Sequence, residues 1–165
     1  MYVGGAGVKA YPKCVNCLFH NNFADGNILE PVGKGGAAFC ADLCDIVLTN
    51  CTLVLNSATS TGAGGLHHVA TCPPPTPPRL FNTYVTNCIF WGNHSPQMAG
   101  LNETLNSTVQ SVSGVQGICT DVGQNSSSDP LFANFNGGDF RLSAGSPAID
   151  SGRPGSFKTK VTFSI

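Results

Sequence analysis

Short runs rich in apolar residues, each opened by an Asn-Cys pair and closed by Asn, recur three times along the chain. They occupy residues 16–22, 50–56 and 87–93, at offsets of 34 and 37 residues. Self-similarity at such a period is typical of stacked repeats rather than of one globular core. Alternate residues of a strand point to opposite faces, and stacked parallel strands repeat at about 4.8 Å. The pattern predicts an all-β fold, a right-handed parallel β-helix of about five or six coils, with one to two coils per repeat.

Repeated positions in such a stack predict ladders of like side chains. The Cys and the apolar positions are expected to point inward, since Cys behaves as a small buried hydrophobe. The closing Asn is expected at the bend after the strand, where it tolerates a left-handed backbone and its amide can bond along the stack. The predicted ladders are Cys17, Cys51 and Cys88; Phe19, Leu53 and Phe90; and Asn22, Asn56 and Asn93.

Glycine pairs recur in step with these runs. They stand at residues 4–5, 35–36 and 64–65, and each opens a stretch that leads to the next Asn-Cys pair. Glycine adopts positive φ without steric cost. We therefore expect these pairs at the opposite corner of the coils, where the backbone needs positive φ.

The residue composition divides the chain into three parts. Residues 1–128 form the predicted repeat region, interrupted by a proline-rich segment at 72–79 that cannot enter a strand ladder and is expected to be a stiff loop. Residues 129–152 carry turn-rich phrases that predict a closing element for the C-terminal end of the β-helix. Residues 153–165 are expected to be a tail.

Composition and charge exclude several classes of function. Only 10% of the 165 residues are charged, and 8 basic and 9 acidic side chains give a net charge of −1. Nucleic-acid binding is not expected, because no basic patch is present. The sequence lacks the roughly 18 consecutive apolar residues of a membrane span, and no helical periodicity extends over three turns.

Cysteine usage and glycosylation signals favour an extracellular or cell-surface location. The chain has eight Cys, without the paired CxxC spacing of a zinc ribbon, so no metal or other cofactor is predicted. Cysteines outside the repeated phrase are expected to supply most disulfides; they are Cys14, Cys40, Cys44, Cys72 and Cys119. The N-x-S/T sequons predict candidate glycosylation sites at Asn50, Asn93, Asn102, Asn106 and Asn125.

The chain opens inside a glycine marker and shows no signal-peptide pattern. We therefore expect it to be a piece of a longer protein, with its N-terminal end covered by further parts of the parent chain or by a neighbouring subunit. An uncovered strand edge is a template for adding another strand.

Candidate catalytic residues are few. Asp42 and Asp45, with Lys34 nearby, form the one candidate acidic pair, but their spacing puts them on opposite faces of a straight strand. For His67 and His68 we expect one solvent-facing and one buried ring rather than a metal site. No repeated acidic position supplies the paired carboxylates that sugar hydrolysis needs, so the chain is not predicted to be an enzyme.

The repeated phrases resemble those of polymorphic outer-membrane proteins, which pair a GGA(I/L/V) motif with FxxN. Here the motifs appear as residues 35–38, 19–22 and 90–93, with Leu53 replacing Phe in the middle copy. The closing segment, with Asp-Pro-Leu-Phe at 129–132 and Gly-Ser-Pro-Ala-Ile-Asp-Ser-Gly at 145–152, is similar to the C-terminal end of secreted parallel β-helix proteins. The resemblance implies a pectate-lyase-like right-handed β-helix outside the cell, and the family's members are mostly adhesins or surface proteins.

Two functions remain open at this level. The first is a noncatalytic structural or adhesive β-helix, a glycoprotein component that binds other protein subunits. The second is a carbohydrate-active enzyme or carbohydrate-binding module for acidic polysaccharide. Trp91 discriminates between them: if Phe90 points inward, Trp91 faces outward, and an exposed Trp91 beside clustered acids would favour sugar binding.

Overall fold

The computed structural model shows an all-β chain, as predicted. It describes residues 1–3, 10–25, 35–41, 45–59, 62–69, 83–94, 96–100, 102–105, 107–110, 115–116, 119–121 and 124–152, and within these ranges every element is a strand. The proline-rich segment at 72–79 and the predicted tail at 153–165 lie outside the described residues.

Most of the strands belong to three parallel sheets. The first sheet contains, in spatial order, β1 (Tyr2–Val3), β5 (Ala38–Ala41), β9 (Leu66–Val69), β12 (Met98–Gly100) and β15 (Val115–Gln116). The second sheet contains β16 (Cys119–Asp121), β13 (Asn102–Leu105), β10 (Thr83–Thr86), β6 (Val47–Thr49) and β2 (Lys13–Val15). The third sheet contains β14 (Thr108–Val109), β11 (Ile89–Trp91), β7 (Thr52–Val54) and β3 (Leu18–His20).

Two smaller sheets complete the set. Strands β4 (Phe23–Ala24) and β8 (Ser57–Ala58) pair in parallel and extend the turn after the third sheet. Strands β17 (Phe132–Asn134) and β18 (Asp139–Leu142) form an antiparallel hairpin near the C-terminal end of the described chain.

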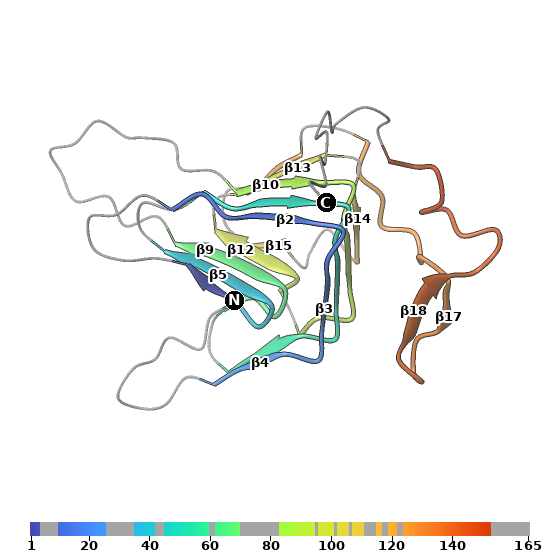
Figure 1. Ribbon diagram of the computed structural model, residues 1–165, viewed down its shortest axis with the longest axis horizontal. Helices are drawn as coiled ribbons and strands as arrows, with labels where there is room; N and C mark the ends of the chain where they lie inside the picture. Colours follow the sequence, from blue (N-terminus) through green and yellow to red (C-terminus); the bar gives the residue numbers. More distant parts are fainter. Residues whose placement is uncertain are drawn as a thin grey trace, which may run out of the picture.

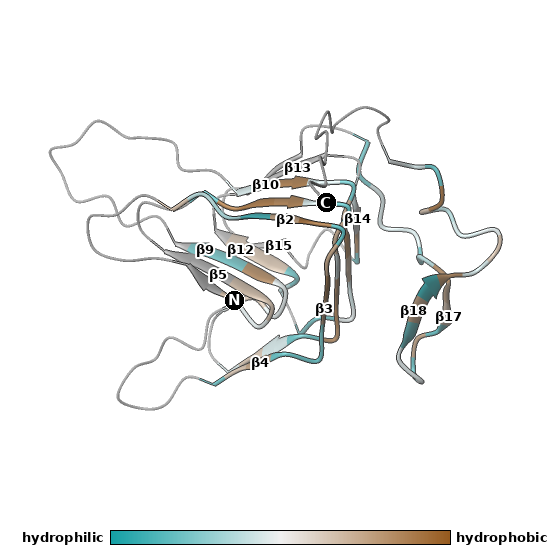
Figure 2. Ribbon diagram, viewed as in Figure 1, coloured by the Kyte–Doolittle hydropathy of each residue, from teal (hydrophilic) through white to brown (hydrophobic). Residues whose placement is uncertain are grey.

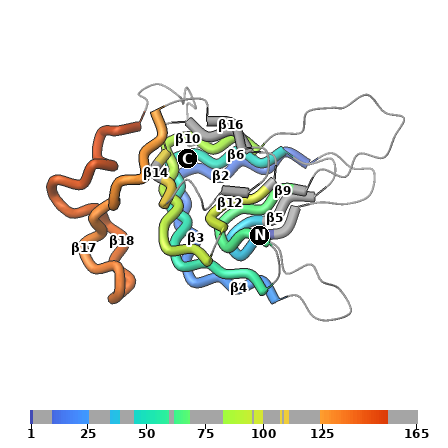
Figure 3. Tube along the Cα trace, turned by 180° about the vertical axis from the view of Figure 1, so that it is seen from behind, coloured from blue at the N-terminus to red at the C-terminus, as the bar shows by residue number. Residues whose placement is uncertain are grey.

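The chain visits the first, second and third sheets in the same order each time, and we call one such round a pass. The first pass is β1–β4, the second β5–β8, the third β9–β11 and the fourth β12–β14, while β15 and β16 begin a fifth. In Figure 1 the strands of the third sheet overlap one another, whereas those of the first sheet are seen side by side, and Figure 3 shows the same layering from behind. Each strand of these three sheets pairs with its counterpart in the neighbouring pass, so a sheet gains one strand with each pass that contributes to it.

Equivalent residues of neighbouring passes lie 34, 37 and 19 residues apart in sequence. The two long offsets are the periods of the sequence pattern. Each therefore spans one pass through the three sheets.

The core lies between the sheets, and its residues are more completely buried after the first pass. In the second and third passes Leu48, Leu53, Val85 and Phe90 are almost completely buried. Their first-pass partners, Cys14 for Leu48 and Phe19 for Leu53, are only half-buried. Figure 2 shows the apolar residues along the strands of the second and third sheets. The first pass is therefore the less covered end of the stack.

The bends around the third sheet use left-handed residues, though not at the predicted positions. Before the sheet, Asn16, Asn50 and Asn87 have φ of 55°, 51° and 53°. After it, the left-handed residues are Asn21, Leu55 and Gly92. The prediction of a left-handed backbone at Asn22, Asn56 and Asn93 is thus off by one, because the chain reverses one residue before the amide that bonds along the stack.

The glycine corner is explained mainly by close backbone approach. Of the pairs at 35–36 and 64–65, Gly35 alone has positive φ, at 73°. A Cβ on Gly64 would lie 2.5 Å from Asn56 O and 2.6 Å from His94 O, which belong to the adjoining turns. The expectation that both pairs need positive φ is wrong, since lack of side-chain volume is what this corner requires. The pair at 4–5 lies outside the described residues.

The β17–β18 hairpin packs against the outer face of the third sheet. Its rings Phe132, Phe135 and Phe140 contact one another with centroids 5.7 to 6.1 Å apart. Phe140 also contacts His20 of β3, with centroids 5.5 Å apart, and Phe135 lies so close to Gly92 that a Cβ there would meet its ring at 2.6 Å. The hairpin of the predicted closing element, residues 129–152, thus lies beside the third sheet in Figures 1 and 3.

Candidate functional site

An amide ladder runs through the bend after the third sheet. The backbone N–H and the side-chain amide of Asn22 both donate to Asn56 Oδ1, at 3.0 and 2.8 Å. Asn56 donates in the same way to Asn93 Oδ1, at 3.0 and 2.8 Å. The second hydrogen of each amide reaches a strand carbonyl, Phe19 O for Asn56 and Leu53 O for Asn93. This pattern satisfies buried polar groups and ties each pass to the next.

The two ends of this ladder differ. At the fourth-pass end, Gln97 Oε1 accepts from the Asn93 amide at 2.7 Å, and Gln97 Nε2 donates back to Asn93 O. At the first-pass end, Asn22 donates to Asn56, but within the described residues its Oδ1 accepts no hydrogen bond. The amide ladder is therefore capped at one end and ends in an acceptor at the other.

A second ladder, of thiols, lies at the bend before the third sheet. Cys17, Cys51 and Cys88 adopt one orientation, because each thiol donates to the carbonyl two residues earlier, at 3.3, 3.3 and 3.2 Å. The backbone N–H of Cys51 lies 3.4 Å from Cys88 Sγ. Cys51 and Cys88 are buried, and Cys17 is half-buried.

Sequence reasoning missed how both ladders continue. The backbone N–H of Cys88 donates to Ser107 Oγ at 3.1 Å, and that of Ser107 donates to Asn125 Oδ1 at 2.8 Å. Gln97 and Gln110 extend the amide ladder. The signal was present as a shorter offset of 19 residues, but the change of residue type from Cys to Ser concealed it.

The pKa values of Cys51 and Cys88 are shifted in opposite directions. Cys14, Cys17, Cys51 and Cys88 are all free thiols. Hydrogen bonding with the side chain of Cys88 and, more weakly, with the backbone of Cys17 lowers the pKa of Cys51. Burial raises the pKa of Cys88 and of Cys14.

The disulfide expected of Cys14 is absent, since its half-buried side chain packs against the core. Cys44 and Cys72 lie outside the described residues, and of Cys40 and Cys119 only the backbone is described.

A groove separates the thiol bend from the hairpin. Its cavity of about 450 Å³ is lined by Cys17, Leu18 and Asn50 on one side and by Phe140 and Arg141 on the other. Arg141 is paired with Asp139, with Nη2 2.6 Å from Oδ2 and Nε 2.8 Å from Oδ1. These hydrogen bonds lower the pKa of Asp139 to about 2. The carboxylate is thus held ionised, which does not suit a general acid.

Of the candidate catalytic residues, Asp45 alone lies within the described residues. Asp42 and Lys34 lie outside them, and Asp45 is half-buried, with its backbone N–H donating to Ala10 O at 3.1 Å. Within the described part of the chain, no three His, Cys, Asp or Glu side chains are grouped as metal ligands.

The expectation of one solvent-facing ring at residues 67–68 is wrong, because both are buried. His67 Nδ1 accepts from the Ala63 N–H at 3.2 Å, which folds its ring onto the preceding turn. His68 Nδ1 is hydrogen-bonded to Thr83 Oγ1 at 3.2 Å.

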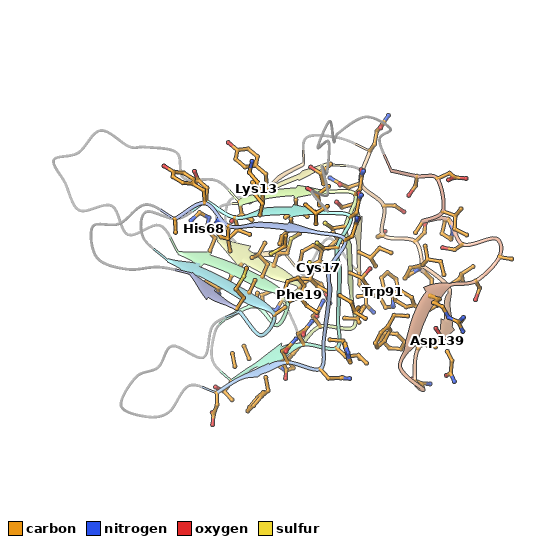
Figure 4. All side chains as sticks on the ribbon, in the orientation of Figure 1. Lys13, Cys17, Phe19, His68, Trp91 and Asp139 are labelled. Atoms are coloured by element: carbon orange, nitrogen blue, oxygen red, sulfur yellow. The ribbon has the colours of Figure 1, made fainter. Side chains whose placement is uncertain are left out.

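Trp91 lies on the outer face of the third sheet and points toward the hairpin in Figure 4. It follows the fully buried Phe90 and is itself half-buried. Its position matches the predicted outward direction.

The described sequons differ in accessibility. Asn50 is exposed at its bend, whereas Asn93 is 5% exposed and its amide donates two hydrogen bonds. Asn125 is half-buried and accepts from Ser107. Asn106 and the side chain of Asn102 lie outside the described residues.

No protein-family model matches the chain, and neither the curated proteins nor the solved structures contain a significant match. In the part that the structure describes, no helix has the length and apolar character to span a membrane.

Proposed function

We propose that the chain is a noncatalytic structural or adhesive module of an extracellular or cell-surface assembly, built as a right-handed parallel β-helix. The repeated order of the three parallel sheets and the one-pass register of both ladders support the β-helix. The observation that carries the function is the edge of the first pass, where, among the strands that the structure describes, the three sheets end in β1, β2 and β3.

This first-pass edge carries apolar side chains that its own fold leaves in solvent. Leu18 is 51% and Phe23 62% exposed, whereas their partners in the second pass, Thr52 and Ser57, are half-buried. Val15 is also exposed, although its partner Thr49 is 1% exposed. A strand edge with exposed apolar residues favours the addition of another strand.

The amide ladder indicates the chemistry of that strand. Each Asn amide oxygen within the ladder accepts from the backbone and the amide of the preceding pass. Asn22 Oδ1 offers the same two acceptor directions, so a strand with Asn in register would complete the ladder. A further part of the parent chain or a neighbouring subunit with the same repeat fits this description.

Light scattering over a range of concentrations tests the proposal. We expect the 165-residue chain to associate, and the double variant Leu18→Lys, Phe23→Lys to remain monomeric, because charges on an edge strand oppose pairing. Tyr84→Lys, also at an exposed position but on the central strand β10, is the matched control and is expected to associate like the parent. A monomer that cleaves polysaccharide would contradict the proposal.

The groove favours one alternative, a binding module for acidic polysaccharide. The Arg141 side chain is 84% exposed at its rim, beside Phe140. Binding of polygalacturonate to the chain, measured by calorimetry and lost in Arg141→Gln, would support this alternative. Since Arg141 already pairs with Asp139, we expect no such binding.

A further inference from the structure

The thiol ladder brings two cysteines together at the less covered end of the stack. Cys17 and Cys51 directly precede β3 and β7, whose residues pair in parallel as Leu18 with Thr52. The Thr52 N–H donates to Cys17 O at 2.9 Å, and Cys51 Sγ lies 3.4 Å from Cys14 O in the first pass. The Cys51 sulfur is therefore directed at the pass that carries Cys17.

The orientation of the two side chains suits a covalent link. Both thiols point toward the carbonyl two residues earlier, at 3.3 Å, so one stacks over the other. Strands of a parallel sheet lie about 4.8 Å apart, which is within the roughly 4.4–6.8 Å between Cα atoms that a disulfide spans.

Access distinguishes Cys17 from the other members of the ladder. Cys17 is half-buried and lines the groove beside the hairpin, which lets a small solute reach its sulfur. Cys51 and Cys88 are each 1% exposed. An oxidant therefore meets Cys17 first, and Cys51 is the next thiol along the ladder.

We propose that Cys17 and Cys51 form an oxidation-sensitive pair that is converted to a disulfide by hydrogen peroxide or a related two-electron oxidant. The Cys17 thiolate attacks the peroxide oxygen, the O–O bond breaks, hydroxide leaves, and Cys17 becomes a sulfenic acid. Cys51 sulfur then attacks Cys17 sulfur, the S–O bond breaks, and the hydroxyl leaves as water. Overall, two thiols and one peroxide give one disulfide and two waters.

Cys14 and Cys88 are poorer partners for Cys17. Cys14 lies in β2 of the second sheet, across the bend, and its thiol is made less acidic by burial. Cys88 belongs to the third pass, with Cys51 between it and Cys17. The lowered pKa of Cys51 agrees with its assignment as the resolving thiol.

The test is peroxide treatment of the reduced full chain, followed by alkylation and mass spectrometry of its proteolytic peptides, with fragmentation to identify the linked residues. We expect a Cys17–Cys51 link in the parent chain and in the Cys14→Ser and Cys88→Ser variants. In Cys51→Ser the link is lost and Cys17 is trapped by dimedone as a sulfenic acid. The disulfide should raise the melting temperature by several degrees relative to the reduced chain, since it staples the first pass to the second.

A link between Cys17 and any other cysteine, a Cys51–Cys88 link, or no disulfide at all would overturn the proposal. Melting curves under reducing conditions establish that each variant is folded before oxidation. Cys17→Ser changes the half-buried member of the pair rather than the buried one, so it provides a second variant in which loss of the link is expected.

Discussion

Asn56 Oδ1 accepts two hydrogen bonds from Asn22, one from its backbone at 3.0 Å and one from its side-chain amide at 2.8 Å. Asn56 in turn donates the same two bonds to Asn93. One side chain therefore serves as acceptor for the pass on one side and as donor for the pass on the other. The Asn positions that repeat along the sequence are thus the positions whose polar groups hydrogen-bond to one another.

Asn56→Ala is expected to destabilise the chain by about 3 kcal/mol, because it leaves buried donors and acceptors of two neighbouring passes unpaired. Asn22→Ala, at the exposed end of the amide ladder, is the matched control and should cost about 1 kcal/mol or less. Urea unfolding followed by circular dichroism measures both. Equal losses of unfolding free energy in the two variants would contradict the prediction that Asn56, bonded on both sides, contributes more than Asn22 at the end of the amide ladder.

Gly64→Ala is expected to destabilise by about 3 kcal/mol, because the new methyl group would meet Asn56 O and His94 O and displace backbone of two passes. Gly138→Ala is the control. Gly138 has φ of 79° but nothing within 4 Å of a Cβ, so it should cost only about 1 kcal/mol of backbone strain. Thermal unfolding of the two variants shows whether glycine is needed to avoid a clash or to allow positive φ. A larger loss of stability in Gly138→Ala than in Gly64→Ala would contradict the steric explanation.

Phe135→Ala is expected to release the hairpin from the outer face of the third sheet. Phe135 packs on Gly92, next to Trp91, the single tryptophan of the chain. The fluorescence of Trp91 should therefore shift to longer wavelength as water replaces the hairpin. Phe23→Ala, at the exposed first-pass edge, should leave the emission unchanged. An unshifted spectrum in Phe135→Ala would show that Trp91 is covered by something else.

The pair of Asp139 and Arg141 predicts a specific pH dependence. Asp139 has a pKa of about 2 in the folded chain, against about 4 for an unfolded aspartate. Its contribution to stability is therefore present above pH about 4 and is lost as the pH falls toward 2. In Arg141→Gln, NMR titration of the Asp139 carboxyl carbon should give a pKa back in the ordinary range. A pKa that stays at about 2 would exclude Arg141 as the cause.

Glycosylation is expected to distinguish the two sequons of the bends. When the chain is secreted from a eukaryotic host, peptide mass spectrometry should find a glycan at the exposed Asn50 and none at Asn93, whose amide is buried and fully hydrogen-bonded. Asn50→Gln is the control that removes the modified peptide. Occupancy of Asn93 would require that modification precedes folding of the ladder.

The ladder residues were accessible to sequence reasoning because stacking repeats them at the period of a pass. Cys51 and Asn56 recur as Cys88 and Asn93 at the same offset of 37 residues. Contacts that do not repeat gave no such signal. Nothing periodic connects Phe135 to Gly92 or Phe140 to His20, so the placement of the hairpin could not be predicted.

Other differences arise from local backbone geometry. The left-handed residue falls at Leu55 rather than at Asn56, although Leu is a poor residue for that conformation. The amide ladder holds Asn56 in place, and its tertiary hydrogen bonds thereby override the conformational preference of Leu55. His67 is likewise buried by a bond to Ala63 N–H that alternation along a strand does not include.

Core residues are more completely buried in the third pass than in the first. This difference has a consequence for how amide hydrogens exchange with solvent. Each pass is held mainly by its immediate neighbours, so opening can proceed one layer at a time. The edge strands β2 and β3 border a half-buried core, whereas β10 and β11 lie between two neighbours around the fully buried Phe90. Deuterium uptake at the first-pass edge should therefore advance inward from Leu18 toward Ile89, and a strand added at the first pass would slow exchange in the layers next to it.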